Sequence, residues 1–234
     1  MVSYFQGGYN EAKLYSRGSD KKIYFKCPDC GKIKNKMIHI STLYLTKNIS
    51  CECSDKISYP EKFFTSILNQ LNLPFEREFV FYGYKYRYDF ISYSIKKNRL
   101  FIVETNGGLG HGNLTWNKDI QDSRKALLRD FEKIILSLSY NIPIITIDCM
   151  KSDKNYIKNS ILNNKELLEY IDVTSINWDE CDKYAMKNII KIICEDYNLQ
   201  HDMNYLSNKY KIPILRIKSY IKKGKQYGWI INKD

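Results

Sequence analysis

The stretches YRYDFIS (residues 86–92) and RLFIVETN (residues 99–106) decide the fold expected for the middle of this chain. The first belongs to an alternating aromatic pattern over 79–93 that Gly83 interrupts, which predicts a hairpin. The second is a nearly continuous apolar run, typical of a buried central strand. Helical spacing precedes them at 58–71 and follows at 119–138, and a second buried strand is expected at 141–149. This order predicts a mixed α/β core.

Two acidic residues stand within these strands. Asp89 lies in the second strand of the hairpin, and Glu104 closes the central strand. A buried carboxylate lowers stability by several kcal/mol unless it is paired or bound to metal. Two carboxylates on adjacent strands make an oxygen site for Mg²⁺, an ion that activates water and stabilises charge on a phosphate. Taken singly, each could also be a solvated strand end.

Other candidate residues flank this pair. Glu61 follows Ser58 and Pro60, which suit the start of a helix. His111 lies in the glycine-rich stretch GGLGHGN, where an imidazole that titrates near neutral pH could position or accept a proton. Asp122 and Lys125 share one face of the helix expected at 119–138. The alternatives are a surface histidine and a surface ion pair.

In order and spacing these residues resemble the PD-(D/E)xK nuclease superfamily over roughly residues 58–150. Glu61, Asp89 and the run Glu104-Thr105-Asn106 carry the likeness, with Asn106 where the superfamily has lysine. Lysine migrates onto the following helix in some members, so Lys125 is the expected substitute. The resemblance implies a Mg²⁺-dependent nuclease fold.

A closer likeness is to the very-short-patch-repair branch of that superfamily. Thr105, Gly107 and His111 match the Thr-His-Gly turn and second histidine of the branch, and Asn106 replaces the first histidine. The likeness implies that the Thr105 backbone helps to hold metal, that His111 works near the scissile phosphate and that Glu61 is catalytic. Phage homing endonucleases with this core carry a Glu, Asp, His, Asp set, which Glu61, Asp89, His111 and Asp122 resemble in order.

Four of the seven cysteines fall into two pairs, Cys27 and Cys30 in CPDCGK and Cys51 and Cys53 in CEC. Two such pairs about twenty residues apart can complete a tetrahedral zinc site. The alternatives are that Asp55 supplies one ligand, or that the second pair are ordinary small residues. The remaining cysteines lie in apolar stretches and are expected in the core.

The C-terminal part has the outline of a helix-turn-helix module. Helices are expected at 184–197, 203–210 and 214–223, with Gly224 as a C-cap. The tail KKGKQYGWI resembles the end of such modules in phage homing endonucleases. On the last helix Ile214, Ile217 and Ile221 form the expected buried face. The side chains expected to reach DNA are Arg216, Lys218, Ser219, Lys222 and Lys223. Alternatively, these lysines merely face solvent.

The net charge of +11 is unevenly distributed. Residues 1–53 hold 9 basic and 4 acidic side chains, residues 54–200 hold 20 of each, and residues 201–234 hold 8 and 2. Basic ends around a neutral middle favour a polyanionic partner, double-stranded DNA, although a lysine-rich proteome gives the same composition. Three modules are therefore expected: a zinc-binding module at 1–56, a nuclease core at 57–172 and a DNA-binding module at 173–234.

Several classes of protein are disfavoured. Apolar runs are far shorter than a membrane span, no signal peptide is evident, and the glycines fit no nucleotide-binding motif. The expectation is a cytoplasmic, site-specific, Mg²⁺-dependent DNA endonuclease of the homing type with structural Zn²⁺. Alternatives are a restriction or mismatch-nicking endonuclease, a DNA-binding regulator without catalysis, and an RNA-processing role. A monomer is expected, with a dimer as the alternative.

Overall fold

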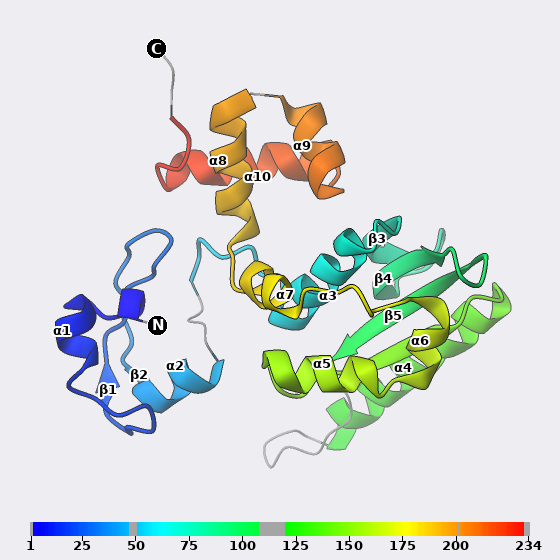
Figure 1. Cartoon of the computed structure of the whole chain (residues 1–234), viewed down its shortest axis with the longest axis horizontal. Coiled ribbons are helices and arrows are strands. Elements are labelled where there is room, and N and C mark those ends of the chain that lie inside the picture. Colours follow the sequence, from blue (N-terminus) through cyan, green and yellow to red (C-terminus); the bar gives the residue numbers. More distant parts are fainter. Residues whose placement is uncertain (1, 47–50, 108–119, 201, 232–234) are drawn as a thin grey trace. The chain divides into compact units, whose positions relative to one another are not determined.

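The computed structural model describes residues 2–46, 51–107, 120–200 and 202–231 (Figure 1). The chain forms two compact units: a central unit of Ser58–Ala185, and a terminal unit that combines Met1–Ile57 with Met186–Asp234. This division differs from the three modules expected from the sequence. The first and last modules belong to one unit, and residues 173–185 belong to the central unit.

The central unit is mixed α/β, as the order of patterns predicts. Its four-stranded sheet has the order β3-β4-β5-β6, in which β5 and β6 are parallel and the other neighbours antiparallel. The long helix α4 connects the two parallel strands. The elements are α3 (Tyr59–Gln70), β3 (Phe75–Val80), β4 (Arg87–Ser94), β5 (Arg99–Asn106), α4 (Ile120–Ser139), β6 (Ile144–Asp148), α5 (Lys154–Leu162), α6 (Lys165–Tyr170) and α7 (Trp178–Ala185).

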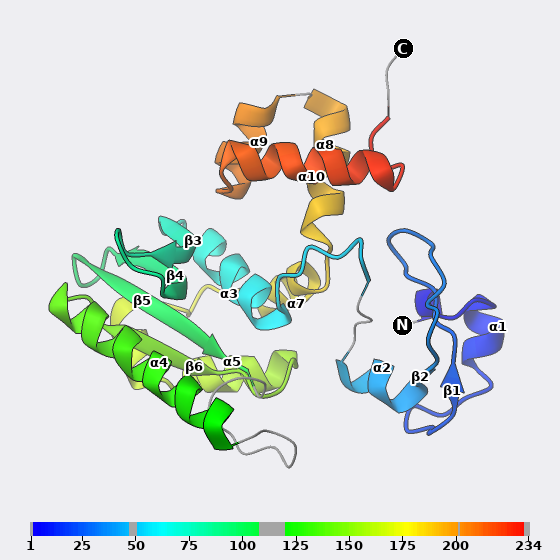
Figure 2. The same ribbon diagram turned by 180° about the vertical axis from the view of Figure 1, so that it is seen from behind.

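Helices cover both faces of this sheet (Figures 1 and 2). On one face α3, α5, α6 and α7 enclose the larger core, which includes Phe64, Phe90 and Val103. On the other face α4 packs through Leu136. Burial of these apolar side chains contributes roughly 1.5–3 kcal/mol for each large residue. The two catalytic candidates on the strands therefore sit in a sheet that is enclosed from both sides.

Helix α3 begins where its sequence predicts. Ser58 is the N-cap, and its hydroxyl accepts the Glu61 N–H at 3.2 Å, while Pro60 occupies the first turn. Apolar residues at helical spacing then bury the helix against the sheet, with Phe63, Phe64, Ile67 and Leu68 inside. Because the cap fixes the first turn, Glu61 is held on a well-defined helix end.

The alternation of strand β4 is interrupted at Asp89. Tyr88 and Ile91 belong to the cluster under α4, whereas Phe90 belongs to the core on the opposite face. Strict alternation would place Tyr88 and Phe90 on one face. On the neighbouring strand, Glu78 has a φ of +53°, a left-handed conformation that is uncommon for a non-glycine residue. The register of β3 with β4 is the same before and after Glu78 and Asp89, so the irregularity is local and inserts no extra residue.

The terminal unit contains short N-terminal elements and three C-terminal helices. A small core forms around Phe5, Phe25 and Leu43, and a second lies between the helices. The elements are η1 (Val2–Tyr4), α1 (Gly8–Ala12), β1 (Lys22–Ile23), β2 (Ile38–His39), α2 (Ile40–Thr46), α8 (Ile189–Gln200), α9 (Met203–Tyr210) and α10 (Ile214–Gln226). Across the described ranges, no helix has the length and apolarity that a bilayer crossing requires.

Gly224 is not the C-cap that the sequence predicts. Helix α10 continues to Gln226, and Gly224 is buried inside it against α8. A Cβ at this position would lie 2.2 Å from Cys194 Sγ and 3.3 Å from Cys194 Cβ. The glycine is therefore needed for close approach of two helices rather than for a left-handed turn.

Gly224→Ala should destabilise the protein by roughly 2 kcal/mol, because overpacking outweighs the better helix propensity of alanine. Adding Cys194→Ala removes the sulfur that the new Cβ would meet. The loss in free energy of unfolding of the double variant should be smaller than the sum of the two single losses by at least about 1 kcal/mol. Urea unfolding of the four proteins measures this coupling.

Gly18→Ala is the matched control, because no atom lies within 4 Å of a Cβ built there. It should change the free energy of unfolding by less than about 0.5 kcal/mol. Strict additivity of Gly224→Ala and Cys194→Ala would show that the two helices do not pack this closely.

Candidate functional site

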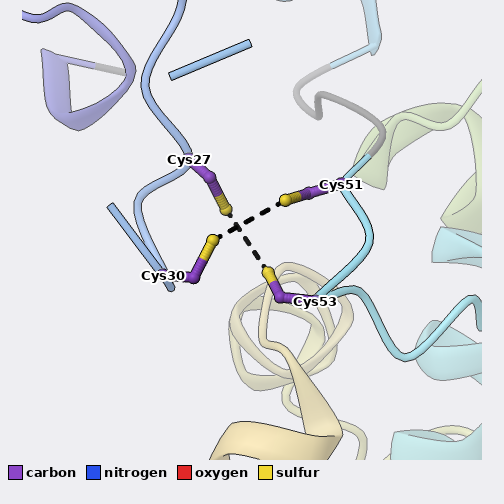
Figure 3. A group of neighbouring side chains, drawn as sticks. All are labelled: Cys27, Cys30, Cys51 and Cys53. Atoms are coloured by element: carbon purple, nitrogen blue, oxygen red, sulfur yellow. Dashed lines mark hydrogen bonds between the residues drawn. The ribbon is translucent and has the colours of Figure 1, made fainter. Parts of the chain in front are cut away.

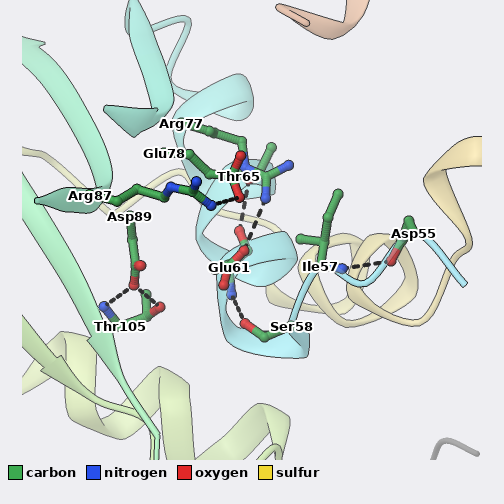
Figure 4. Close-up of polar contacts among 10 residues, drawn as sticks. All are labelled: Asp55, Ile57, Ser58, Glu61, Thr65, Arg77, Glu78, Arg87, Asp89 and Thr105. Carbon is green, nitrogen blue, oxygen red and sulfur yellow. Dashed lines mark hydrogen bonds and ion pairs between the residues drawn. The ribbon is translucent and has the colours of Figure 1, made fainter. Parts of the chain in front are cut away.

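Asp89 and Thr105 form the centre of a polar cluster on neighbouring strands β4 and β5 (Figure 4). The Thr105 N–H donates to Asp89 Oδ2 at 2.8 Å, and the Thr105 hydroxyl donates to the same oxygen at 2.6 Å. Among the residues that the structure describes, no donor reaches Asp89 Oδ1. Thr105 thus orients the carboxylate through two donors and leaves its second oxygen for another ligand.

Glu104, the residue before Thr105, is buried with only 8% of its surface exposed. Lys133 Nζ on α4 lies 2.5 Å from Glu104 Oε1 as an ion pair, yet no donor is aligned on this oxygen for a hydrogen bond. Burial and the charge of Asp89 raise the pKa of Glu104 to about 7, although the Lys133 ammonium opposes the shift. Glu104 therefore holds a proton more tightly than an ordinary carboxyl.

Lys133 is the functional candidate that the sequence analysis missed. Its ammonium lies 4.9 Å from the centre of the Tyr88 ring, and the Tyr88 hydroxyl donates to the Lys133 carbonyl at 2.8 Å. Lys125, the lysine expected at the site, is exposed two turns earlier on α4. The lysine that meets the strand carboxylate is thus Lys133, on the sheet side of the helix.

Glu61 joins the cluster from the first turn of α3. Its Oε2 lies 3.0 Å from Arg77 Nη2 in an ion pair that is mostly buried. Burial raises the pKa of Glu61, the charge of Asp89 raises it further, and Arg77 and the Ser58 hydroxyl oppose the rise. Both glutamates therefore respond to the charge of Asp89, which places three carboxylates in one electrostatic environment.

The remaining predicted site residues stand as follows. His111 lies outside the described residues, and so does the side chain of Asp122, although its backbone belongs to α4. Asn106 is half-buried at the end of β5, opposite Asp148 on β6. From the set expected from the sequence, the structure joins Asp89 to Thr105 by hydrogen bonds, and Glu61 and Glu104 are each within the electrostatic influence of Asp89.

The pKa of Glu104 makes stability depend on pH. Between its ordinary value of 4.5 and about 7, the folded chain keeps a proton that the unfolded chain releases. The free energy of unfolding therefore falls as pH rises through this window and stays lower above it. Glu104→Gln should remove the fall, so its stability relative to wild type should rise between pH 5 and pH 8 by up to about 3 kcal/mol.

The measurement is urea unfolding of both proteins, without divalent ions added, from pH 5 to pH 8. The advantage of Glu104→Gln should grow with pH. Glu76→Gln changes an exposed glutamate on β3 and should show no such growth. An equal effect of Glu104→Gln at both pH values would contradict the raised pKa.

The four paired cysteines converge from two segments of the terminal unit (Figure 3). Cys27 Sγ and Cys53 Sγ are 3.5 Å apart, Cys30 Sγ and Cys51 Sγ are 3.7 Å apart, and all four sulfurs lie within 4.8 Å of one another. Four sulfurs at the usual Zn–S distance of about 2.3 Å would be about 3.8 Å apart in a tetrahedron. The cluster can therefore bind a metal ion such as zinc.

Burial and the neighbouring thiols change the pKa values of these cysteines. Burial raises the pKa of Cys27 to about 11 and raises the pKa of Cys53 as well. At Cys51 burial again acts upward, but the Cys53 N–H and the neighbouring thiols outweigh it and lower the pKa. Without a cation the cluster would hold protons that four-thiolate ligation must release.

Asp55 does not act as the alternative ligand. Its Oδ2 accepts the Ile189 N–H at 2.8 Å, and its Oδ1 accepts the Ile57 N–H at 3.0 Å. Asn188 beside it donates through Nδ2 to the Cys53 carbonyl at 3.1 Å. These contacts fix the start of α8 directly on the cysteine segment.

The C-terminal tail also returns to the cysteines. Trp229 Nε1 donates to the Asp29 carbonyl at 3.2 Å, and Tyr227 and Trp229 pack against the cysteine cluster. Lys223 Nζ donates to the Ser54 carbonyl at 2.8 Å. Lys223 is thus half-buried and engaged in the fold, and its expected contact with DNA stays a prediction.

The other residues expected to reach DNA lie on the outer side of α10. Ile217 and Ile221 are buried, as expected, and Ile214 is only half-buried. The exposed residues are Arg216, Lys218, Ser219 and Lys222. The terminal unit holds 20 basic and 9 acidic residues, whereas the central unit holds 17 of each. The whole net charge of +11 therefore belongs to the unit that contains the cysteines and α10.

Because the tail packs on the cysteines, removal of a bound metal should loosen it. We expect about one zinc ion per purified chain, and less than about one tenth of that in Cys30→Ser. Chelation of the wild type should change the fluorescence of Trp229 and increase proteolysis after residue 186.

Cys149→Ser alters a buried cysteine of the central unit and is the control, with zinc content unchanged. Because the chain also contains Trp116 and Trp178, Trp229→Phe identifies the tryptophan responsible for the signal. Wild-type protein without zinc, or a tail unaffected by chelation, would contradict the assignment.

Comparisons with known proteins give no relative for this chain. No family model, no curated protein and no solved structure matches it. Function is therefore inferred from the chemistry of the two clusters and from the distribution of charge.

Proposed function

We propose that the protein is a metal-dependent DNA endonuclease, in which the central unit hydrolyses the phosphodiester bond and the terminal unit holds the duplex. The observation that carries this proposal is the hydrogen-bonded pair of Asp89 and Thr105, with Glu61 and Glu104 each within the electrostatic influence of Asp89. Buried like charges destabilise a fold, so a cluster of this kind favours a functional role.

Asp89 and Glu104 are the residues that would hold Mg²⁺. Their chemistry fits, because carboxylate oxygens are its preferred ligands and both hydrogen bonds to Asp89 from the described residues go to Oδ2. When bound, the ion would supply charge neutralisation at the phosphate and lower the pKa of a coordinated water. Thr105 would keep Asp89 in one orientation through its two hydrogen bonds.

Lys133 and Glu61 would complete the chemistry. A lysine beside the strand carboxylate can stabilise negative charge that develops on phosphorus, because its ammonium is already positioned in a buried site. Glu61, whose pKa is raised, can position or accept a proton from water, while Arg77 limits its movement. His111 keeps the proton-transfer role expected from the sequence.

The terminal unit would supply affinity for DNA. Its net positive charge suits the phosphate backbone, and Arg216, Lys218, Ser219 and Lys222 would contact phosphates or base edges from α10. Zinc at the four cysteines would stabilise this unit rather than take part in hydrolysis. A site-specific homing endonuclease is the favoured role, with restriction or mismatch nicking as alternatives within the same chemistry.

A DNA-binding regulator without catalysis is the second candidate. Each carboxylate already has a protein partner: Thr105 for Asp89, Lys133 for Glu104 and Arg77 for Glu61. The network is therefore electrostatically supported without a metal, and Asn106 stands where the resembled superfamily has lysine. Such a protein would bind DNA with the same terminal unit and never cut it.

Cleavage of genomic DNA from the source of the chain, with Mg²⁺ and sequencing of the ends, tests the proposal. Wild type should give discrete ends, and Asp89→Asn should lose at least about 10³-fold in rate, because the metal ligand is weakened. The amide oxygen introduced by this substitution can still accept from Thr105, so the fold and DNA binding should persist.

Lys133→Met and Lys125→Met form a matched pair on the same helix. Lys133→Met should slow cleavage by roughly 10²–10³-fold, and Lys125→Met by less than about threefold. DNA binding without cutting by the wild type, with Mg²⁺ or Mn²⁺, would favour the regulator. If only Lys125→Met lost activity, the catalytic lysine would be Lys125, as the sequence predicts, and not Lys133.

A further inference from the structure

Helix α4 exposes a long apolar face. Between 46% and 65% of the surface of six large side chains is exposed on it. This set, called the α4 stripe, consists of Leu127, Leu128, Phe131, Ile134, Ile135 and Leu138. Single exposed apolar residues are normal on proteins, but a contiguous group of this kind marks an interaction surface.

The stripe lies on the side of α4 opposite the sheet. Lys133, Leu136 and Ser137 are the residues that face inward: Lys133 contacts Glu104, Leu136 packs in the core, and Ser137 is fully buried. At 100° per residue, the centre of the stripe is turned about half a revolution from these residues. The apolar side chains therefore cannot contribute to the core under α4.

The spacing of the stripe is that of a helix-pairing surface. Leu128, Phe131, Ile135 and Leu138 follow each other at intervals of three, four and three residues, which are the a and d positions of a heptad. Leu127 and Ile134 widen the surface on one side. The charged residues of this segment lie off the stripe, so its occupant should be apolar and helical.

The area is close to that of a stable interface. With roughly 180–200 Å² for a fully exposed residue of this size, the stripe presents on the order of 600 Å². The largest patch on a typical monomer is about 300–600 Å², and a stable interface buries about 800 Å² on each partner. Side chains at the border of the stripe would supply the difference.

We propose that the α4 stripe binds a second copy of this chain, α4 against α4 about a two-fold axis. A heptad stripe is self-complementary, so one apolar surface satisfies both partners without a separate receptor site. An anionic membrane is disfavoured, because such surfaces attract helices with a basic polar face and the central unit has equal numbers of acidic and basic residues.

Dimerisation has a consequence that rests on the proposed function. Lys133 and the stripe belong to opposite sides of one helix, so pairing of the stripes would stabilise the helix that carries the lysine to Glu104. Two copies would also bring two carboxylate clusters into one particle. Such a particle can cut both strands of a duplex, one strand at each cluster.

Sedimentation velocity of the full chain at about 50 µM tests the dimer without reference to cleavage. Wild type should have twice the 27.8 kDa mass of one chain. Leu128→Lys and Phe131→Lys should each give the mass of one chain, because a lysine would be buried in an apolar interface. Both positions are exposed in the single chain, so circular dichroism should show the fold retained.

Ile95→Lys is the matched control, since Ile95 is a highly exposed apolar residue of the same unit outside α4. It should leave the dimer intact. Wild type with the mass of one chain would overturn the proposal, and protection of α4 amides from exchange would then indicate cover by another part of the same chain. A dimer that persists in both stripe variants would also overturn it, because a different surface would hold the copies together. None of these outcomes depends on nuclease activity.

Discussion

The electrostatic environment of Asp89 is the constraint on which the central unit depends. Three carboxylates share it, two of them with a raised pKa, and each is held by a different element: Thr105 on β5, Lys133 on α4 and Arg77 on β3. Hydrophobic packing alone would have placed apolar residues in these positions. Strand β4 also departs from strict alternation at Asp89, so the local backbone and the charge cluster depend on one another.

Local patterns in the sequence predicted much of this arrangement, because their causes are local. The cap at Ser58, the apolar run of β5 and the spacing of the cysteine pairs depend on neighbours along the chain. Glu61, Asp89 and Glu104 could be named because acidic residues are unusual at strand and helix positions of this kind. The parallel pairing of β5 with β6 follows from the helix between them.

Other features could not be predicted, because they depend on contacts between distant residues. Gly224 looks like a helix stop until Cys194 is found in the space that a side chain there would need. No local pattern predicts that the Lys223 ammonium donates a hydrogen bond to the Ser54 carbonyl. In the same way, the joining of the two basic ends in one unit requires the bonds from Asn188 and Trp229 to the cysteine segment. Spacing along the chain contains no signal for these pairs.

Helix α4 shows why Lys133 escaped detection and why its two faces need a common explanation. The apolar periodicity of residues 127–138 predicts that this face is buried, which would leave Lys133 in solvent. In the fold of one chain, Lys133 instead faces the sheet and pairs with Glu104, and the apolar face of α4 is exposed. A helix so oriented is poorly stabilised by its own unit. This orientation becomes favourable when the outer face is also covered. Burial of its apolar side chains would then stabilise a helix whose inner face contacts charged residues.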